Sequence, residues 1–192
     1  MQKLLILLLL VLLAGCETNE EEAEALPPGI DESDLGTESF GVEYYFSDSA
    51  RVTAKMLAAH VTEKEENVAG EVPEANEKTE TVHYLDGGVE LYFLNFAGRS
   101  HSTIKSDSAR FQRERGIAKL TGSVVMTNYK GETMNTEELY WDQEKDSVFT
   151  DKFVRIETPD KVIIGNNGLR SNSDFTAYTI YGIQGEVETD DP

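Results

Sequence analysis

The chain of 192 residues carries 36 Asp and Glu against 17 Lys and Arg, which gives a formal charge of −19. This charge argues against nucleic acid as a partner, because phosphate recognition depends on clustered basic residues. The single cysteine, Cys16, excludes a disulfide framework.

Residues 1–15 have the pattern of a lipoprotein signal peptide. Lys3 precedes an apolar run from Leu4 to Leu13, which is shorter than the roughly 20 residues of a membrane-spanning helix. A basic residue, a short apolar run and a small-residue cleavage site are typical of a secretory signal. The segment "LAGC" ending at Cys16 matches the bacterial lipobox, so we expect a lipidated Cys16 that tethers the chain to a membrane. The alternative is an ordinary signal peptide with an incidental cysteine.

The stretch after Cys16 is acidic and poor in apolar residues. From Glu17 to Glu38 there are nine acidic residues and no basic one, so little apolar surface is available to offset the entropy of folding. We therefore expect residues 16–39 to comprise the lipidated cysteine and a disordered acidic linker. A folded domain then covers residues 40–188, and residues 189–192 form an acidic tail.

Strand patterns dominate from Phe40 onward. Apolar side chains recur at every second position in Val89–Phe93, Leu120–Met126 and Val148–Ile156. Gly-, Asn- and Pro-containing turn signals separate these segments. Short strands at this spacing predict an all-β sandwich, barrel or solenoid.

The segment from Ala50 to His60 fits either a helix or a strand. Its Ala and Met content favours a helix by propensity. Its alternation places Val52, Ala54 and Met56 on one side of a strand, and we predict a strand because its surroundings are strands.

The pentapeptide "SDSAR" occurs twice, at residues 47–51 and 106–110. Together with a weaker self-similarity at a step of about 30 residues, it predicts stacked strand pairs in which each copy holds the same place. Ala50 and Ala109 would then point inward. Gly122 and Gly185 occupy similar strand contexts and are expected to mark bends or bulges.

The segment from Gly131 to Val187 resembles the LptC family of lipopolysaccharide-transport proteins. Its most specific parts are "TEELYWD", "SVFTDKFVRI" and "GLRSNSDFTAYTI". "YYFSDSARVTAKML" is similar to the opening strand of the family, and "YLDGGVELYFLNFAGR" is similar to its next hairpin. The resemblance therefore covers most of residues 40–187.

This resemblance implies a twisted, open antiparallel β-jellyroll whose two sheets enclose an apolar groove for lipid acyl chains. Such proteins are not enzymes, and no cofactor is expected. They accept lipopolysaccharide from an inner-membrane ABC transporter and pass it to a periplasmic LptA-like bridge protein. The resemblance implies a periplasmic protein held by its lipid anchor, with the inner membrane favoured over the outer.

The chain departs from the family pattern in two places. A lipobox stands where the best-known members have an uncleaved transmembrane helix. The acidic stretch from Thr62 to Thr81 is expected to be an inserted or enlarged loop.

Strand alternation identifies the apolar side chains that would point inward. They are candidates for the lipid groove, although a sealed core would show the same alternation. The candidates are Val89, Leu91, Phe93, Val124, Met126, Leu139, Trp141, Val148, Val154, Ile156, Ile164 and Ile183. Trp141 in particular is either a lipid contact or a plug of the core.

The last strands are expected to form an open sheet edge. An unpaired edge aggregates unless it is covered or used, and β-augmentation by the bridge protein would use it. The candidate edge residues are Thr176, Tyr178, Ile180, Gly185 and Val187. The opposite edge, roughly Phe40 to Met56, would face the transporter.

Residues for other chemistry are sparse. His60, His83 and His101 lack metal-ligand spacing, and no nucleophile motif or phosphate-binding loop is present. Two alternatives remain at this point. One is a structural or surface lipoprotein whose β-repeat binds a protein or glycan, and the other is a β-solenoid enzyme acting on polysaccharide.

Overall fold

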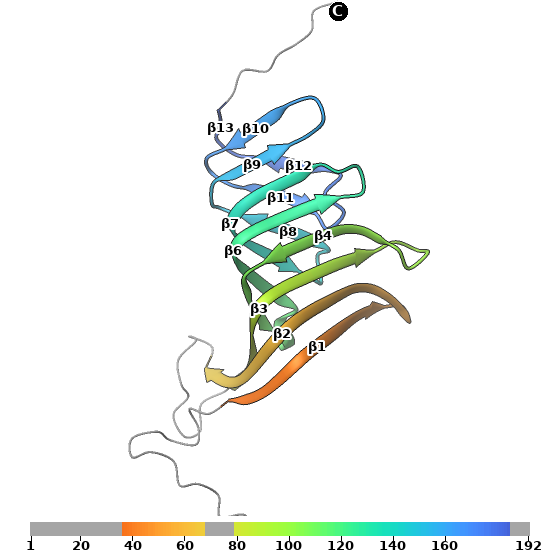
Figure 1. Ribbon diagram of the computed structural model, residues 1–192, viewed down its shortest axis with the longest axis vertical. Coiled ribbons are helices and arrows are strands. Elements are labelled where there is room, and N and C mark those ends of the chain that lie inside the picture. The colour runs from red at the N-terminus through yellow and green to blue at the C-terminus, as the bar shows by residue number, and fades with distance from the viewer. Residues whose placement is uncertain (1–35, 68–78, 185–192) are drawn as a thin grey trace, which may run out of the picture. The chain divides into compact units, whose positions relative to one another are not determined.

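The computed structural model describes residues 36–67 and 79–184, which form one antiparallel sheet of 13 strands (Figure 1). The strands are β1 (Thr37–Asp48), β2 (Arg51–Asn67), β3 (Thr79–Leu94), β4 (Ser100–Ser106), β5 (Ser108–Gln112), β6 (Ile117–Asn128), β7 (Thr133–Asp142), β8 (Ser147–Thr150), β9 (Val154–Glu157), β10 (Val162–Gly165), β11 (Leu169–Asn172), β12 (Tyr178–Ile180) and β13 (Ile183–Gln184). The only helical segment in these two ranges is a 3-10 turn at Arg113–Arg115. The prediction of an all-β fold is confirmed.

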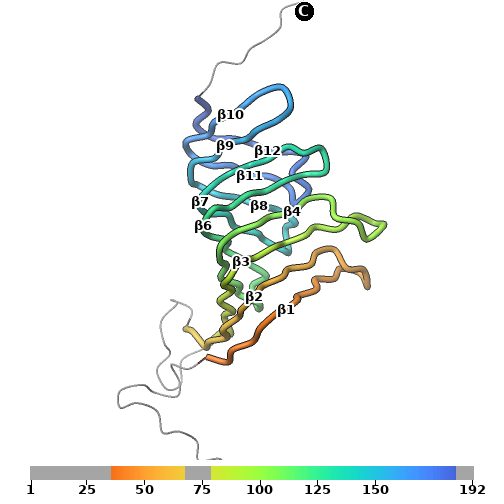
Figure 2. The backbone as a smooth tube through the Cα atoms, in the orientation of Figure 1, coloured from red at the N-terminus to blue at the C-terminus, as the bar shows by residue number. Residues whose placement is uncertain are grey.

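The sheet folds over because its long strands change partners midway. In β3, Val82–Leu85 pair with β5, whereas Val89–Leu94 pair with β4. In β7, Thr133–Asn135 pair with β9 and Tyr140–Asp142 pair with β8. Each long strand therefore runs from one wall of the sheet into the other, as the tube in Figure 2 shows.

The corner between the walls is built from glycines and one aspartate. Gly88 N–H donates to the carbonyl of Asp107 (3.1 Å), and Asp107 N–H donates to the carbonyl of Gly122 (3.0 Å). Gly88 and Gly122 both have positive φ, at 96° and 77°. The β6–β7 register shifts between Thr121 and Val124, so the expected bulge at Gly122 is confirmed.

Both walls contribute side chains to one continuous core. Leu120, Leu139 and Leu169 come from one wall, and Leu91 and Ile156 come from the other. The main path of the sheet runs from β1 to β12, and these two strands do not pair with each other. The described domain is therefore a twisted, open antiparallel β-jellyroll.

Two expectations about local structure need correction. The stretch Thr62–Thr81 is not wholly a loop, because Thr62–Asn67 of β2 pair with Thr79–Tyr84 of β3. The two "SDSAR" copies do not hold the same place. Ala50 lies in the exposed β1–β2 turn with φ +62°, whereas Ala109 is buried in β5. The first copy forms the β1–β2 hairpin turn and the second lies at the corner of the sheet. The identical sequence of the two copies therefore does not mark a structural repeat.

The strand prediction for Ala50–His60 is confirmed, since β2 begins at Arg51. β1 begins at Thr37, slightly before the expected start of the domain. The signal peptide, Cys16, the acidic linker up to residue 35, Gly185 and the acidic tail lie outside the described residues.

Candidate functional site

The interior between the two walls is apolar and deeply buried. Most of the expected groove residues lie in it at 4 % exposure or less: Val89, Leu91, Phe93, Val124, Met126, Leu139, Trp141, Val148, Val154 and Ile156. They alternate with half-buried or exposed side chains along β3, β6, β8 and β9 and most of β7, so one face of each of these strands contributes to the same interior.

The expected position of Ile164 needs correction. Ile164 pairs with Arg155, whereas its neighbour Ile163 pairs with the core residue Ile156 and packs against the core. Cross-strand partners share a face of the sheet, so the register places Ile163 inside and Ile164 outside. Ile183 is 60 % exposed on β13, which pairs only with β10 among the described strands.

Aromatic rings fill the interior next to β1. The ring of Phe46 lies 4.8 Å from Trp141 and 5.4 Å from Phe111, both in edge-to-face geometry. The ring of Phe93 also packs edge-to-face with Trp141, at 5.6 Å between ring centres. Edge-to-face packing is the favoured geometry for such rings, so this cluster stabilises the end of the core that β1 covers.

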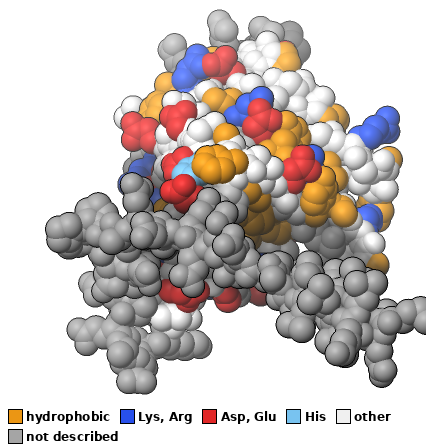
Figure 3. All heavy atoms as spheres, turned by 60° about the horizontal axis from the view of Figure 1, so that its bottom comes forward, with side chains coloured by type: hydrophobic (Ala, Val, Ile, Leu, Met, Phe, Trp, Pro, Cys, Tyr) orange, Lys and Arg blue, Asp and Glu red, His pale blue; other side chains and the backbone are white. Residues whose placement is uncertain are grey.

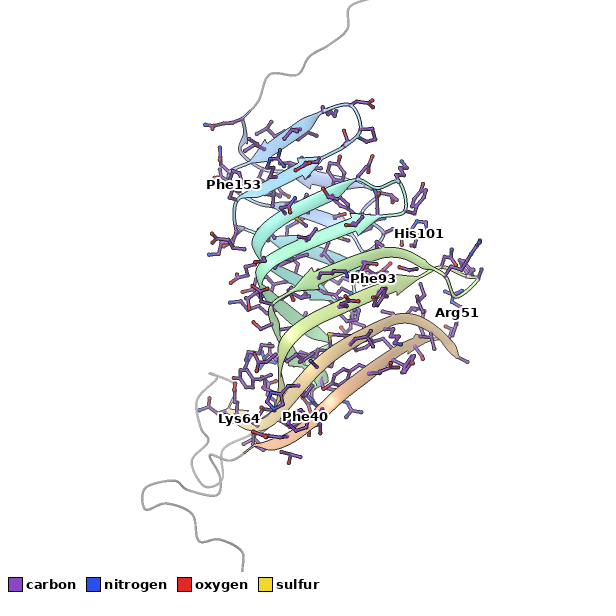
Figure 4. All side chains as sticks on the ribbon, viewed as in Figure 1. Phe40, Arg51, Lys64, Phe93, His101 and Phe153 are labelled. Carbon is purple, nitrogen blue, oxygen red and sulfur yellow. The ribbon has the colours of Figure 1, made fainter. Side chains whose placement is uncertain are left out.

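A cavity of about 700 Å³ opens beside this cluster, at the hairpin ends of the strands. Its lining includes Phe93 and Leu94 of β3, Arg51 of β2 and His101 of β4; Figure 4 labels Arg51, Phe93 and His101 at this side of the sheet. Because Phe93 contacts both the cavity and Trp141, one aromatic side chain separates the cavity from the buried ring of Trp141.

The cavity rim carries both signs of charge. The guanidinium carbon of Arg51 lies 3.9 Å from the centre of the Phe96 ring, in a cation–π contact. His101 Nε2 lies 3.9 Å from a carboxylate oxygen of Asp174. Asp48 and Glu144 also line the rim. Polar and charged side chains make up most of the lining, together with the apolar side chains of Phe93, Leu94 and Phe96, and such a mixed lining suits an amphipathic ligand.

A polar network closes the interior at the other ends of β2 and β3. His83 is 3 % exposed, and its Nδ1 lies 2.9 Å from Tyr44 Oη and 3.4 Å from Glu63 Oε1. Burial lowers the pKa of His83, although the Glu63 carboxylate opposes this, and burial raises the pKa of Tyr44 to about 12. Nearby, the buried Glu66 accepts a hydrogen bond from Arg110 at 2.6 Å. The Glu66 carboxylate is paired in this way, whereas His83 Nε2 is buried without a hydrogen-bond partner among the described residues.

The two end strands of the path are placed differently. β1 pairs only with β2 among the described strands, and its side chains Phe40 and Tyr45 are 74 % and 59 % exposed. Figure 3 turns this end forward and shows hydrophobic side chains interspersed with acidic ones. At the other end, Thr176 is exposed, while Tyr178 and Ile180 of β12 are half-buried against the core. The other expected edge residues, Gly185 and Val187, lie outside the described residues.

Within residues 36–67 and 79–184, no group of three His, Cys, Asp or Glu side chains is arranged to hold a metal ion. The same ranges contain no helix that is long and apolar enough to cross a membrane.

Some core residues were not anticipated from the sequence. Phe46 and Leu169 are buried in alternating strand segments, so a fuller count of period-2 positions would have found them. Phe175 is fully buried although it lies in a turn with φ +52°, and no sequence pattern marks it.

The geometry defines an open antiparallel β-jellyroll built around one apolar interior. Residues 89–183 match the family described as "Lipopolysaccharide-assembly, LptC-related", and the chain belongs to this family. It therefore has a non-enzymatic role in lipopolysaccharide transport in the periplasm. No curated protein matches the chain.

Proposed function

We propose that this protein accepts lipopolysaccharide from an inner-membrane ABC transporter and passes it to a periplasmic LptA-like bridge protein. The observation that carries the proposal is the single apolar core between two walls of a sheet whose end strands do not close on each other. Each methylene transferred from water into such an interior contributes roughly 0.8 kcal/mol, so acyl chains can be held without covalent chemistry. The match of residues 89–183 to the LptC-related family supports a role in lipopolysaccharide transport.

The two end strands suit two different protein partners. β1 presents exposed Phe40 and Tyr45 and would face the transporter. Tyr178 and Ile180 of β12, with Thr176 just before the strand, would pair with the bridge protein; the other expected edge residues, Gly185 and Val187, lie outside the described residues. Main-chain pairing at sheet edges gives affinity with little demand on side chains.

The proposed anchor is a lipidated Cys16 after removal of residues 1–15, with the inner membrane as its site. Residues 16–39 would then act as a tether. A Cys16→Ser variant expressed in cells should leave the membrane fraction, and its retention there would contradict the anchor.

Photo-crosslinking to labelled lipopolysaccharide tests the groove. Val154 and Phe153 are adjacent in the chain, but Val154 is buried in the core while Phe153 is 50 % exposed; Figure 4 labels Phe153. A photoreactive residue at Val154 or Val124 should form adducts with lipopolysaccharide in cells that export it, and one at Phe153 should not. Absence of adducts from both inward positions would contradict lipid binding in the interior and favour a structural lipoprotein.

A further inference from the structure

The indole N–H of Trp141 is a buried donor with no hydrogen-bond partner among the described residues. Trp141 is 2 % exposed on β7, and no acceptor in residues 36–67 or 79–184 lies within hydrogen-bond distance of its Nε1. Buried indole N–H groups usually find an acceptor, and leaving one unpaired is costly. Such unpaired atoms are few in the described part of the chain: Trp141 Nε1 and His83 Nε2 are the two buried side-chain atoms without a partner there. A bound ligand can supply the acceptor that the described residues do not offer to the indole.

The surroundings of Trp141 show from which side that acceptor can come. Phe46 of β1 and Phe93 of β3 both pack edge-to-face with the indole, with ring centres at 4.8 Å and 5.6 Å. Phe93 also lines the cavity of about 700 Å³, whose rim carries Arg51 and His101. Phe93 is thus the residue that both lines the cavity and contacts the Trp141 ring, so a ligand with its polar end in this cavity lies one side chain away from the indole.

We propose that Trp141 Nε1–H donates a hydrogen bond to the first oxygen of an acyl chain bound in the interior. A hydrocarbon tail has no acceptor, so the ester or amide carbonyl at its head, or a hydroxyl on the chain, is the atom that can pair with the indole. The bond fixes how deeply the chain enters and favours acyl over alkyl chains. This inference rests on the proposed lipid-binding function and names the donor that orients the lipid.

The competing explanation is local to the protein. Phe46 meets Trp141 at an interplanar angle of 86°, a geometry in which an aromatic face can act as a weak acceptor for an N–H group. In that case the indole N–H contributes to stability alone, and its removal leaves ligand preference unchanged.

A Trp141→Phe variant separates the two explanations, because it removes the N–H and keeps an aromatic ring. The probes are purified lipopolysaccharide and two lysophospholipids with the same head group and chain length, one ester-linked and one ether-linked. Affinities are measured by displacement of a fluorescent fatty-acid analogue. The variant should lose about three- to tenfold affinity for lipopolysaccharide and the ester probe, with the ether probe unchanged. Phe93→Leu is the matched control, since it reshapes the same wall without touching the N–H and should affect both lysolipids alike.

The wild-type protein provides a second measurement that does not depend on a variant folding. Trp141 is the only Trp in the chain, so the indole N–H band in an ultraviolet resonance Raman spectrum reports this one group. The band should shift to the hydrogen-bonded position with the ester probe and stay unshifted with the ether probe. If wild type binds lipopolysaccharide but neither the Raman band nor the ester preference depends on Trp141, the inference is overturned. If wild type binds no lipopolysaccharide, the proposed function itself fails.

Discussion

At the scale of single residues, the buried His83 makes the free energy of unfolding depend on pH. Burial lowers its pKa below the ordinary value of 6.5, against the opposing effect of the Glu63 carboxylate. Below pH 6.5 the unfolded chain therefore takes up a proton that the folded protein does not. The free energy of unfolding should fall as pH decreases from 6.5 towards the lowered pKa, by at most about 1.4 kcal/mol per pH unit for this one proton. Denaturant unfolding between pH 7 and pH 5.5 measures this slope.

A His83→Asn variant should flatten that slope. Carboxylates with hydrogen-bond partners affect stability at lower pH. The hydrogen bond from Lys105 lowers the pKa of Glu90 below 4.5, so the stabilisation that Glu90 provides is lost only as the pH falls below 4.5. An unchanged slope in the His83 variant would assign the pH dependence to other groups.

At the scale of elements, the sheet corner depends on the close approach of Gly122 to Asp107. A Cβ on Gly122 would lie 2.5 Å from Asp107 Oδ2, and the residue has φ +77°. Gly131, in the β6–β7 turn, has a similar φ of +79° but open space around it. Gly131→Ala should cost about 1 kcal/mol of unfolding free energy from backbone strain alone. Gly122→Ala should cost about 2 to 3 kcal/mol, because strain and crowding add. Equal losses in chemical denaturation would show that the close approach is unimportant.

The sequence predicts strands well because alternation is a local signal, and the β3, β6 and β7 positions named from it are buried. It does not predict which strands pair. Strand β3 pairs first with β5 and then with β4 because it bends between the two pairings. The alternation of apolar and polar residues in the sequence does not reveal this bend. Adjacent Ile163 and Ile164 also make the alternation ambiguous, and only the pairing with Ile156 decides which one points inward. For the candidate site, Trp141 could be named from the sequence, but its unpaired N–H could not.

At the scale of the whole domain, the two open ends set how it can join other proteins. β12 pairs only with β11 among the described strands. Asn172 N–H donates to the carbonyl of Ala177, and Tyr181 N–H donates to that of Gly168. Antiparallel pairing alternates, so the backbone groups of Tyr178 and Ile180 face away from β11 and are free to pair with an added strand.

Ile180 offers the sharpest test of this edge. Its side chain packs where a Cβ on Gly165 would lie, so a charged substitution would damage the core as well as the edge. Ile180→Pro keeps an apolar side chain, removes the outward N–H and loses part of the packing at Gly165, and an edge strand tolerates proline. Ile180→Val is the control, because it shortens the side chain and keeps the donor. The Pro variant should lose capture of the LptA-like bridge protein in a pull-down, while the Val variant keeps it and both unfold at similar temperatures. Capture by the Pro variant at the wild-type level would place the bridge contact on another part of the domain.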